Sequence, residues 1–146
     1  MPANLRSSSV VRRHPENPVL SAERVPYRSA LVFNAGITRF KGRYVMVFRN
    51  DYGDVEKKKL EGTCLGLAWS ADGVKWEAAP EPVFPMEKTD EITWGPYDPR
   101  LTVIDGRCYI CFALDTRHGI RGGIAVTDDF EHFEVLSLSV PDNRNM

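Results

Sequence analysis

The chain has 146 residues, which is room for one domain, and its 42% apolar and 27% charged side chains are typical of globular proteins. Its 19 basic and 20 acidic side chains leave a net charge of −1, which argues against nucleic acid or an anionic membrane as a partner. The apolar runs are only strand-sized and no apolar signal region follows the start, so we expect a soluble cytoplasmic protein.

The first 16 residues show little apolar periodicity and contain the pairs Arg12-Arg13 and His14-Pro15. Such a segment predicts an exposed arm whose basic side chains are solvated. We therefore expect an arm over residues 1–16 and an ordered domain over residues 17–146.

Apolar runs separated by turn residues follow the arm. The dipeptides Lys41-Gly42 and Asp72-Gly73 are typical of tight hairpins. The charged residues 54–62 predict an exposed loop, with one helical turn as the alternative. The strands predicted for this unit cover residues 28–38, 44–48, 63–70 and the stretch from Trp76.

The same pattern then begins again. Residues 101–112 repeat residues 37–48 at an offset of 64, and residues 123–134 repeat residues 66–77 at an offset of 57. Because internal repeats of this kind indicate stacked structural units, the two halves of the chain are expected to fold alike.

Two copies of a four-stranded, up-and-down unit are typical of β-propeller blades. We predict an all-β fold with blade one over about residues 30–85 and blade two over about residues 93–140. Two unrelated antiparallel sheets are the alternative, but they would leave the Gly-Arg pairs that match in the two copies unexplained.

Three cysteines, Cys64, Cys108 and Cys111, are an odd number without framework spacing, which favours free thiols in a reducing compartment. Cys108 and Cys111 form a C-x2-C motif inside an apolar strand. Their spacing places them on opposite faces of that strand, so we expect core packing and no metal site.

Residues 93–100 combine aromatic side chains, a turn, one carboxylate and one guanidinium ahead of a strand. Pro99 is expected to hold Asp98 in an extended conformation, after a bend at Gly95-Pro96. Asp98 would then begin a strand on a rim. An Asp-Pro turn without a chemical role is the alternative. At the repeat offset of 64, Asp98 corresponds to Asn34.

Polar residues at blade starts and hairpin ends are expected to converge on the propeller axis. Carboxylates, amides and guanidinia beside Trp94 and Tyr97 would suit a polyhydroxylated ligand, and a sugar fits best. Hydrogen bonds that only join the blades are the alternative, above all for Arg49 and Asn50. The converging groups are Asn34, Arg49 to Asp51, Asp98 with Arg100, and Asp115 to His118.

Three motifs, residues 48–53, 95–102 and 141–146, resemble glycoside hydrolase family 130, the β-mannoside phosphorylases. The resemblance covers roughly residues 17–146, and Tyr97 to Arg100 is its most specific part. It is closest to the mannosylglucose phosphorylases, with the mannooligosaccharide phosphorylases next. It implies a five-bladed β-propeller, of which this chain would cover about two blades and the start of a third.

The resemblance also implies a reaction. Phosphate would attack the anomeric carbon of a β-mannoside in one inverting step that gives mannose 1-phosphate, and Asp98 would supply the proton through a hydroxyl of the mannosyl unit. Because phosphate is already an anionic nucleophile, the second carboxylate of an inverting hydrolase is unnecessary. No cofactor or metal is expected beyond inorganic phosphate as co-substrate.

The remaining site residues fall into two groups. The positions expected to bind the mannosyl unit are Asn34, Arg49, Asn50, Asp51 and Tyr97. Cationic side chains would hold the phosphate, and the positions expected there are Arg117, His118, Arg144 and Asn145.

Family members are considerably longer than this chain, and two blades leave open sheet edges. We therefore expect either a fragment or a ring that a partner chain completes. A homo-oligomer is the other assembly considered. Two functions stay open beside the phosphorylase. They are a propeller-fold glycoside hydrolase and a non-catalytic carbohydrate-binding fragment.

Overall fold

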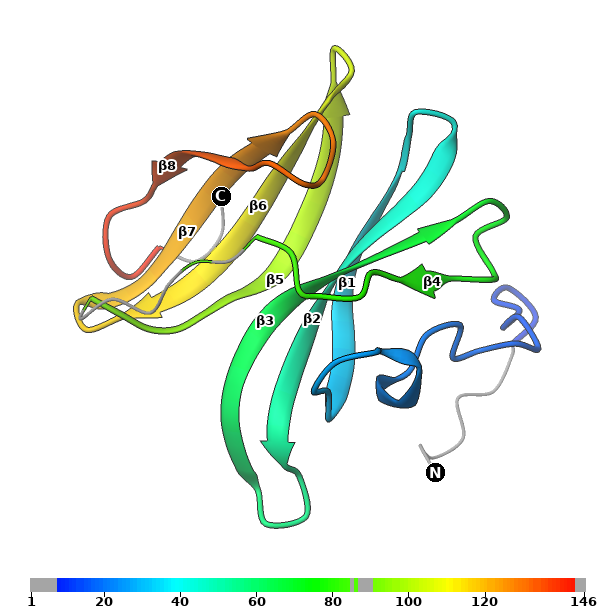
Figure 1. Ribbon diagram of the computed structural model, residues 1–146, viewed down its shortest axis with the longest axis horizontal. Helices are drawn as coiled ribbons and strands as arrows, with labels where there is room; N and C mark the ends of the chain where they lie inside the picture. The colour runs from blue at the N-terminus through cyan, green and yellow to red at the C-terminus, as the bar shows by residue number, and fades with distance from the viewer. Residues whose placement is uncertain (1–7, 85, 87–90, 144–146) are drawn as a thin grey trace.

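The computed structural model describes residues 8–84, 86 and 91–143. Apart from one short 3-10 helix, η1 (Ala22–Arg24), the regular structure of these residues is β, in two antiparallel sheets of four strands (Figure 1). The first sheet contains β1 (Leu31–Phe40), β2 (Arg43–Asp54), β3 (Lys59–Ser70) and β4 (Glu77–Ala78). The second contains β5 (Ile92–Ile104), β6 (Arg107–Thr116), β7 (Gly119–Thr127) and β8 (Glu134–Leu138).

Strand order in each sheet follows chain order, β1-β2-β3-β4 and β5-β6-β7-β8. Each sheet is therefore an up-and-down unit, and the predicted all-β fold is confirmed. No helix in the described part of the chain is long and apolar enough to cross a membrane.

The first hairpin of each sheet turns as its sequence predicts. The backbone φ angles are 46° and 83° at Lys41-Gly42, and 49° and 79° at Asp105-Gly106. Two successive positive φ values belong to the type I′ turn, whose twist matches that of the flanking strands. Both first hairpins are thus set by local turn chemistry.

The second hairpin of the first sheet is longer than its sequence predicts. Pairing between β2 and β3 continues to Asp54 and Lys59, so most of the loop expected over residues 54–62 belongs to strands. Backbone groups gain hydrogen-bond partners by this extension, and the charged side chains stay exposed on either face of the ribbon. Charge alone did not distinguish a loop from an exposed strand pair.

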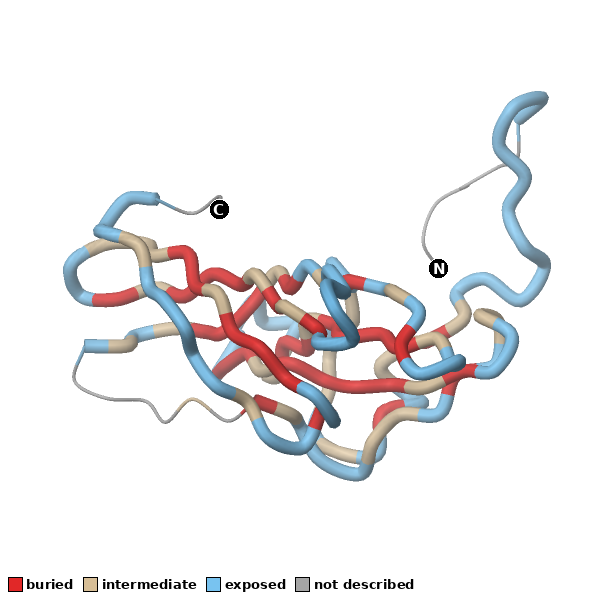
Figure 2. The backbone as a smooth tube through the Cα atoms, turned by 90° about the horizontal axis from the view of Figure 1, so that it is seen from above, coloured by how far each residue is buried: buried red, intermediate tan, exposed pale blue. Residues whose placement is uncertain are grey.

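An aromatic cluster fills the space between the sheets. The ring of Phe130 makes edge contacts with Phe40, Trp69 and Phe133 at centroid distances of 5.2, 5.4 and 6.4 Å. Figure 2 shows the buried segments running through the middle of the molecule. Phe130 has a φ of 63°, and Gly73, its equivalent in the repeat, has 78°. A phenylalanine is strained there, so burial of its ring must compensate.

A second cluster lies on the other face of the first sheet. The segment before β1 places Leu20 and Val25 against Met46, Phe48 and Trp76. Ahead of it, residues 8–16 are exposed, whereas the first seven residues of the expected arm lie outside the described residues. The lead-in therefore covers one outer sheet face.

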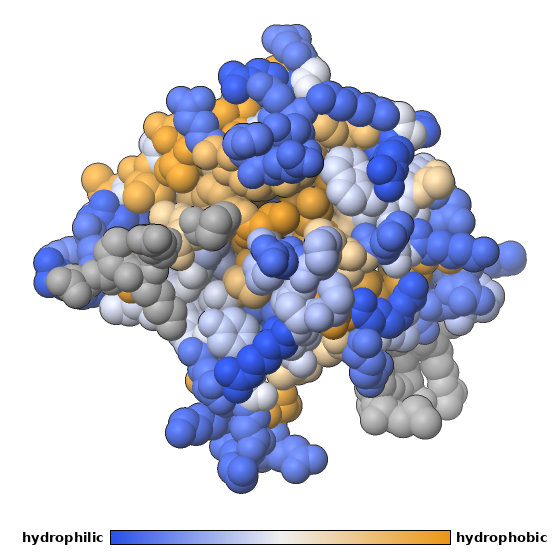
Figure 3. Space-filling view, viewed as in Figure 1, coloured by the Kyte–Doolittle hydropathy of each residue, from blue (hydrophilic) through white to orange (hydrophobic). Residues whose placement is uncertain are grey.

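The outer side of the second sheet has no such cover among the described residues. Figure 3 shows apolar side chains at the surface over this sheet. The exposed apolar side chains on and after β8 are Val135, Leu136, Leu138 and Val140.

Loss of the Phe130 ring should destabilise the fold strongly. Phe130→Ala leaves a cavity between the sheets and is expected to lower the free energy of unfolding by about 3–5 kcal/mol. Urea denaturation measures the loss. Val135→Ala, at a side chain 41% exposed, is the control and should change it by less than about 0.5 kcal/mol. Equal effects of the two variants would contradict this account of the core.

Candidate active site

The site begins with the same backbone irregularity in both first strands. Register shifts occur between Phe33 and Gly36 in β1, and between Tyr97 and Arg100 in β5. Within these bulges Asn34 has a φ of 48° and Asp98 a φ of 53°, a region that Asn and Asp enter more readily than other non-glycine residues.

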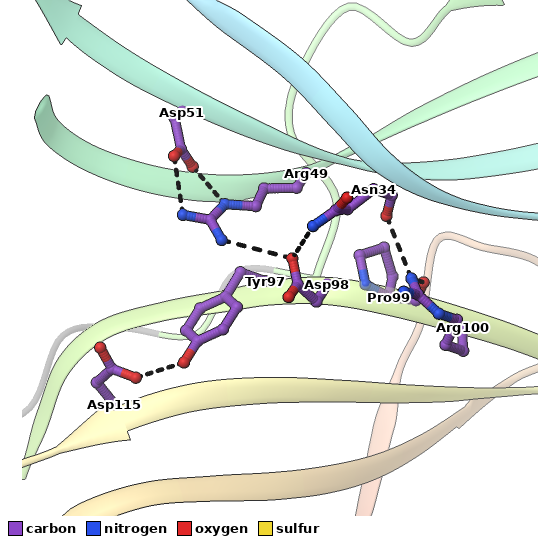
Figure 4. Close-up of polar contacts among 8 residues, drawn as sticks. All are labelled: Asn34, Arg49, Asp51, Tyr97, Asp98, Pro99, Arg100 and Asp115. Atoms are coloured by element: carbon purple, nitrogen blue, oxygen red, sulfur yellow. Dashed lines mark hydrogen bonds and ion pairs between the residues drawn. The ribbon is translucent and has the colours of Figure 1, made fainter. Parts of the chain in front are cut away.

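The two bulges face each other across the sheets, since β5 packs against β1 (Figure 1). The side-chain amide of Asn34 donates from Nδ2 to Oδ1 of Asp98 over 2.8 Å (Figure 4). The pair that the repeat offset makes equivalent is therefore also a pair in space.

The prediction that Asp98 has an extended backbone and begins a strand was wrong. Its φ is positive rather than extended, and it lies inside β5, which begins at Ile92, rather than at a strand's first residue. The restraint from Pro99 is overridden because the bulge inserts an unpaired residue and bends the strand. The bend directs the carboxylate toward the first sheet.

Arg49 on β2 is the second partner of Asp98. Its Nη1 donates to Asp98 Oδ1 over 3.4 Å, while Nε and Nη2 donate to the two oxygens of Asp51 over 2.7 and 2.8 Å (Figure 4). This second contact is a bidentate fork. Burial opposes the charge of Arg49, but the hydrogen bonds and charges of Asp51 and Asp98 together hold its pKa above the ordinary value.

Two aromatic rings fix the plane of this guanidinium. The Arg49 carbon Cζ lies 4.7 Å from the ring centroid of Phe33 and 4.9 Å from that of Tyr97, within the range of cation–π attraction. The Tyr97 hydroxyl donates to the carboxylate of Asp115 on β6. Asp115 therefore joins the network through Tyr97.

The two acids beside Arg49 differ in how far their side chains are exposed. The side chain of Asp98 is 16% exposed, like that of Arg49, whereas Asp51 is 1% exposed. We call the residues Asn34, Arg49, Asp51, Tyr97, Asp98 and Asp115 the acid network. Within it, Asp98 reaches the surface and Asp51 does not.

Asn50 lies outside the acid network. Adjacent strand residues point to opposite faces, and Asn50 is fully buried, with Nδ2 donating to the Arg28 carbonyl over 3.0 Å and contacting Cys64 Sγ at 3.4 Å. This placement fits the structural alternative considered for it. Arg100 is also bound to backbone, with Nη1 donating to the Pro99 carbonyl over 2.8 Å.

Of the four residues expected to bind phosphate, the structure describes Arg117 and His118. Arg117 and His118 are exposed in the β6–β7 turn, where Arg117 Nε lies 3.2 Å from His118 Nε2 and the Arg117 amide donates to the Glu91 carbonyl. Neither side chain bonds to the acid network among the described residues. Arg144 and Asn145 lie outside the described residues.

A hollow of about 890 Å³ borders the acid network, a volume suited to a ligand. Residues 32–35 form its wall on β1, and Arg13, His14 and Asn17 of the lead-in segment also line it. Asn34 is the member of the acid network in this lining. The sequence of this segment predicts only an exposed arm. No local motif connects it with a site.

Among the described residues, one exposed group, Asp129, Glu131 and His132, has ligand atoms close enough to share a cation. Oδ1 of Asp129 accepts the amides of Glu131 and His132, both at 2.8 Å. Asp72, its repeat equivalent, accepts the amides of Val74 and Lys75 in the same way. Because neither of those side chains is a ligand, the carboxylate's role is to hold the turn.

Comparison with known proteins gives a family match over nearly the whole chain. The model of glycoside hydrolase family 130, described as beta-1,4-mannooligosaccharide phosphorylase, matches residues 7–143. A beta-1,4-mannooligosaccharide phosphorylase of Ruminococcus albus is 29% identical over 147 aligned residues, which cover 93% of this chain and 41% of that protein. The chain thus spans less than half the length of this relative.

Solved structures support the propeller architecture. A glycosyl hydrolase from Bacteroides ovatus is 25% identical, with a TM-score of 0.71 over 85% of this chain and 39% of its own. A beta-1,2-mannobiose phosphorylase from Listeria innocua, in complex with beta-1,2-mannobiose, is 19% identical, with a TM-score of 0.68 over 84% of this chain and 49% of its own.

An added charge at Asn34 tests the contact between the bulges. Asn34→Asp replaces the amide donor by a carboxylate facing Asp98, so the free energy of unfolding should fall by about 1–3 kcal/mol near neutral pH. The loss should shrink as the pH approaches about 4, where carboxyls gain protons. Urea denaturation across pH measures it. The control Asn34→Ala loses the donor without adding charge, and the same pH dependence in both variants would contradict the contact.

Proposed function

Because the chain belongs to glycoside hydrolase family 130, we propose that the protein is a β-mannoside phosphorylase. Inorganic phosphate attacks the anomeric carbon from one side, the bond to the leaving sugar breaks, and Asp98 supplies the proton to that sugar through a mannosyl hydroxyl. The products are mannose 1-phosphate and the acceptor sugar. The substrates proposed are mannosyl-glucose and β-1,4-mannooligosaccharides.

The observation that carries the proposal is the setting of Asp98. Its Oδ1 accepts hydrogen bonds from Asn34 and Arg49, which come from two strands of the other sheet. Two N–H groups from different strands fix the direction in which this carboxylate points. Fixed orientation of this kind is what a general acid requires.

One surface-reaching acid is sufficient for phosphorolysis. An inverting hydrolase needs a second carboxylate to deprotonate water, whereas phosphate is already anionic. In the acid network Asp51 is committed to Arg49, and Asp115 accepts from Tyr97. A single acid in the role of Asp98 fits phosphorolysis, and the dependence of turnover on phosphate distinguishes it from the hydrolase alternative.

Phosphate must also be held against its charge. The exposed pair Arg117 and His118 offers donors for charge-assisted contacts, and we assign part of the phosphate site to it. Sugar contacts are assigned to Asn34 and Arg49, whose amide and guanidinium present donors that a saccharide uses. Tyr97, the other expected sugar contact, is 4% exposed and contacts Arg49 with its ring.

Removal of the Asp98 proton should abolish most turnover. In the protein expressed from its complete reading frame, Asp98→Asn is expected to lower kcat by roughly 10²- to 10⁴-fold, measured as mannose 1-phosphate formed from mannosyl-glucose and phosphate. Asp105→Asn, at the exposed tip of the β5–β6 hairpin, is the control and should leave kcat unchanged. Release of free mannose without phosphate dependence would instead identify a hydrolase, and sugar binding without turnover a binding protein.

Arg117→Ala should affect phosphate more than sugar. Loss of a charge-assisted hydrogen bond is worth about 1.5–3 kcal/mol, so the KM for phosphate should rise by roughly 10- to 100-fold while the KM for the mannoside changes little. Arg107→Ala, which removes an exposed arginine paired with Asp128, is the control. Equal changes in both KM values would remove Arg117 from the phosphate site.

A further inference from the structure

The carboxylate of Asp51 is bound differently from that of Asp98. Both of its oxygens are held by Arg49, at 2.7 and 2.8 Å, and its side chain is 1% exposed. A sugar hydroxyl could reach this carboxylate only by displacing the guanidinium. Direct contact with substrate, which the family resemblance implies for Asp51, is therefore not what the geometry favours.

We propose that Asp51 is a positioning residue that acts on the proton donor through Arg49. It fixes the guanidinium and takes up most of its positive charge, and so limits how strongly Arg49 favours the ionised form of Asp98. The inference rests on the proposed function only in giving Asp98 the role of proton donor.

The distances show how the guanidinium is shared. Arg49 meets Asp51 through two short contacts and meets Asp98 through one contact of 3.4 Å. The cation is thus paired mainly with Asp51. Its remaining attraction orients Asp98 without holding it as firmly as a bidentate pair would.

Arg49 cannot easily leave this arrangement. Its guanidinium contacts the rings of both Phe33 and Tyr97, and Tyr97 is itself held by Asp115. Because the guanidinium is held in place, a change of charge at Asp51 alters how strongly Arg49 attracts Asp98. Removal of Asp51 would therefore leave the guanidinium in place with Asp98 as its single acidic partner in the acid network.

The other described groups around Asp98 do not supply this effect. From β1, Asn34 contributes an uncharged amide. From β5 itself, Arg100 donates to the carbonyls of Pro99 and Asn34. From β6, Asp115 reaches the network only through the Tyr97 hydroxyl. Among the described residues, Arg49 is the cation that contacts Asp98 directly, and Asp51 is the counter-charge of Arg49.

The consequence is a defined change in the pH dependence of catalysis. A general acid works only while it is protonated, and an opposite charge within about 4–6 Å favours the ionised form of a carboxyl. With Asp51 neutralised, Asp98 should lose its proton at lower pH. The alkaline limb of the pH–rate profile should then move to lower pH.

The test uses Asp51→Asn in the protein expressed from its complete reading frame. We expect the alkaline limb of kcat/KM for phosphorolysis to move down by roughly one pH unit, with a smaller change in the KM for the mannoside. Asp54→Asn, on the same strand and paired with exposed Lys57, removes the same charge at a distance and should leave the limb in place. The ionisation of phosphate contributes equally to every profile.

Arg49→Gln should shift the alkaline limb in the opposite direction, and it remains a test of the inference if Asp51→Asn does not fold. Without the cation, the alkaline limb should move to higher pH. Opposite shifts from the two members of one ion pair support the inference, because general loosening of the site would not produce them. A raised mannoside KM with an unmoved limb in Asp51→Asn, or an unmoved limb in Arg49→Gln, would overturn it.

A second readout separates this inference from the proposed function. Carbon-13 NMR of the Asp98 carboxyl follows its titration without any substrate. If the unmodified protein forms no mannose 1-phosphate, the proposed function fails, yet a lower titration midpoint in Asp51→Asn would still support the coupling. Identical midpoints in the unmodified protein and Asp51→Asn would overturn the coupling whatever the activity.

Discussion

The contact between the two first strands is the constraint on which the site depends. Asn34 and Asp98 occupy equivalent bulges, and the amide of one donates to the carboxylate of the other. Because these residues come from different sheets, the position of the acid is fixed only when both sheets are folded and packed. Burial of Phe130 between the sheets therefore supports the geometry of Asp98, although the ring itself is not part of the acid network.

The network around this contact divides its work between exposed and buried members. Asp98 and Arg49 are each partly exposed, whereas Asp51 and Tyr97 are buried and hold them from behind. Buried charges need partners that satisfy them fully, and the fork between Asp51 and Arg49 meets that need. The same fork leaves Nη1 of Arg49 for Asp98. Arg49 therefore both satisfies the buried carboxylate of Asp51 and orients the carboxylate of Asp98.

Much of the fold could be predicted because its signals are local. The turn dipeptides Lys41-Gly42 and Asp105-Gly106 set the first hairpins, and the repeat offset makes Asn34 and Asp98 equivalent. The tight hairpin predicted at Asp72-Gly73 was wrong, because that dipeptide lies in a longer loop over residues 71–76 between β3 and β4. The positive φ of Asp98 could not be predicted, because a bulge depends on how two strands pair and not on Pro99 alone. The burial of Asn50 follows from strand alternation beside Arg49, but only once β2 is known to continue past Phe48.

The paired bulges also limit how this chain can vary. A residue added to or removed from β1 near Asn34 would rotate every following side chain to the other face, and would displace the partner that Asp98 requires on the neighbouring sheet. Length changes at the exposed tip of the β2–β3 hairpin, residues 55–58, carry no such penalty, whereas Lys41 at the tip of the β1–β2 hairpin donates to the Asp128 carbonyl of the second sheet. Variation among relatives should therefore concentrate at loop tips, while the spacing from bulge to hairpin in the first strand of each blade stays constant.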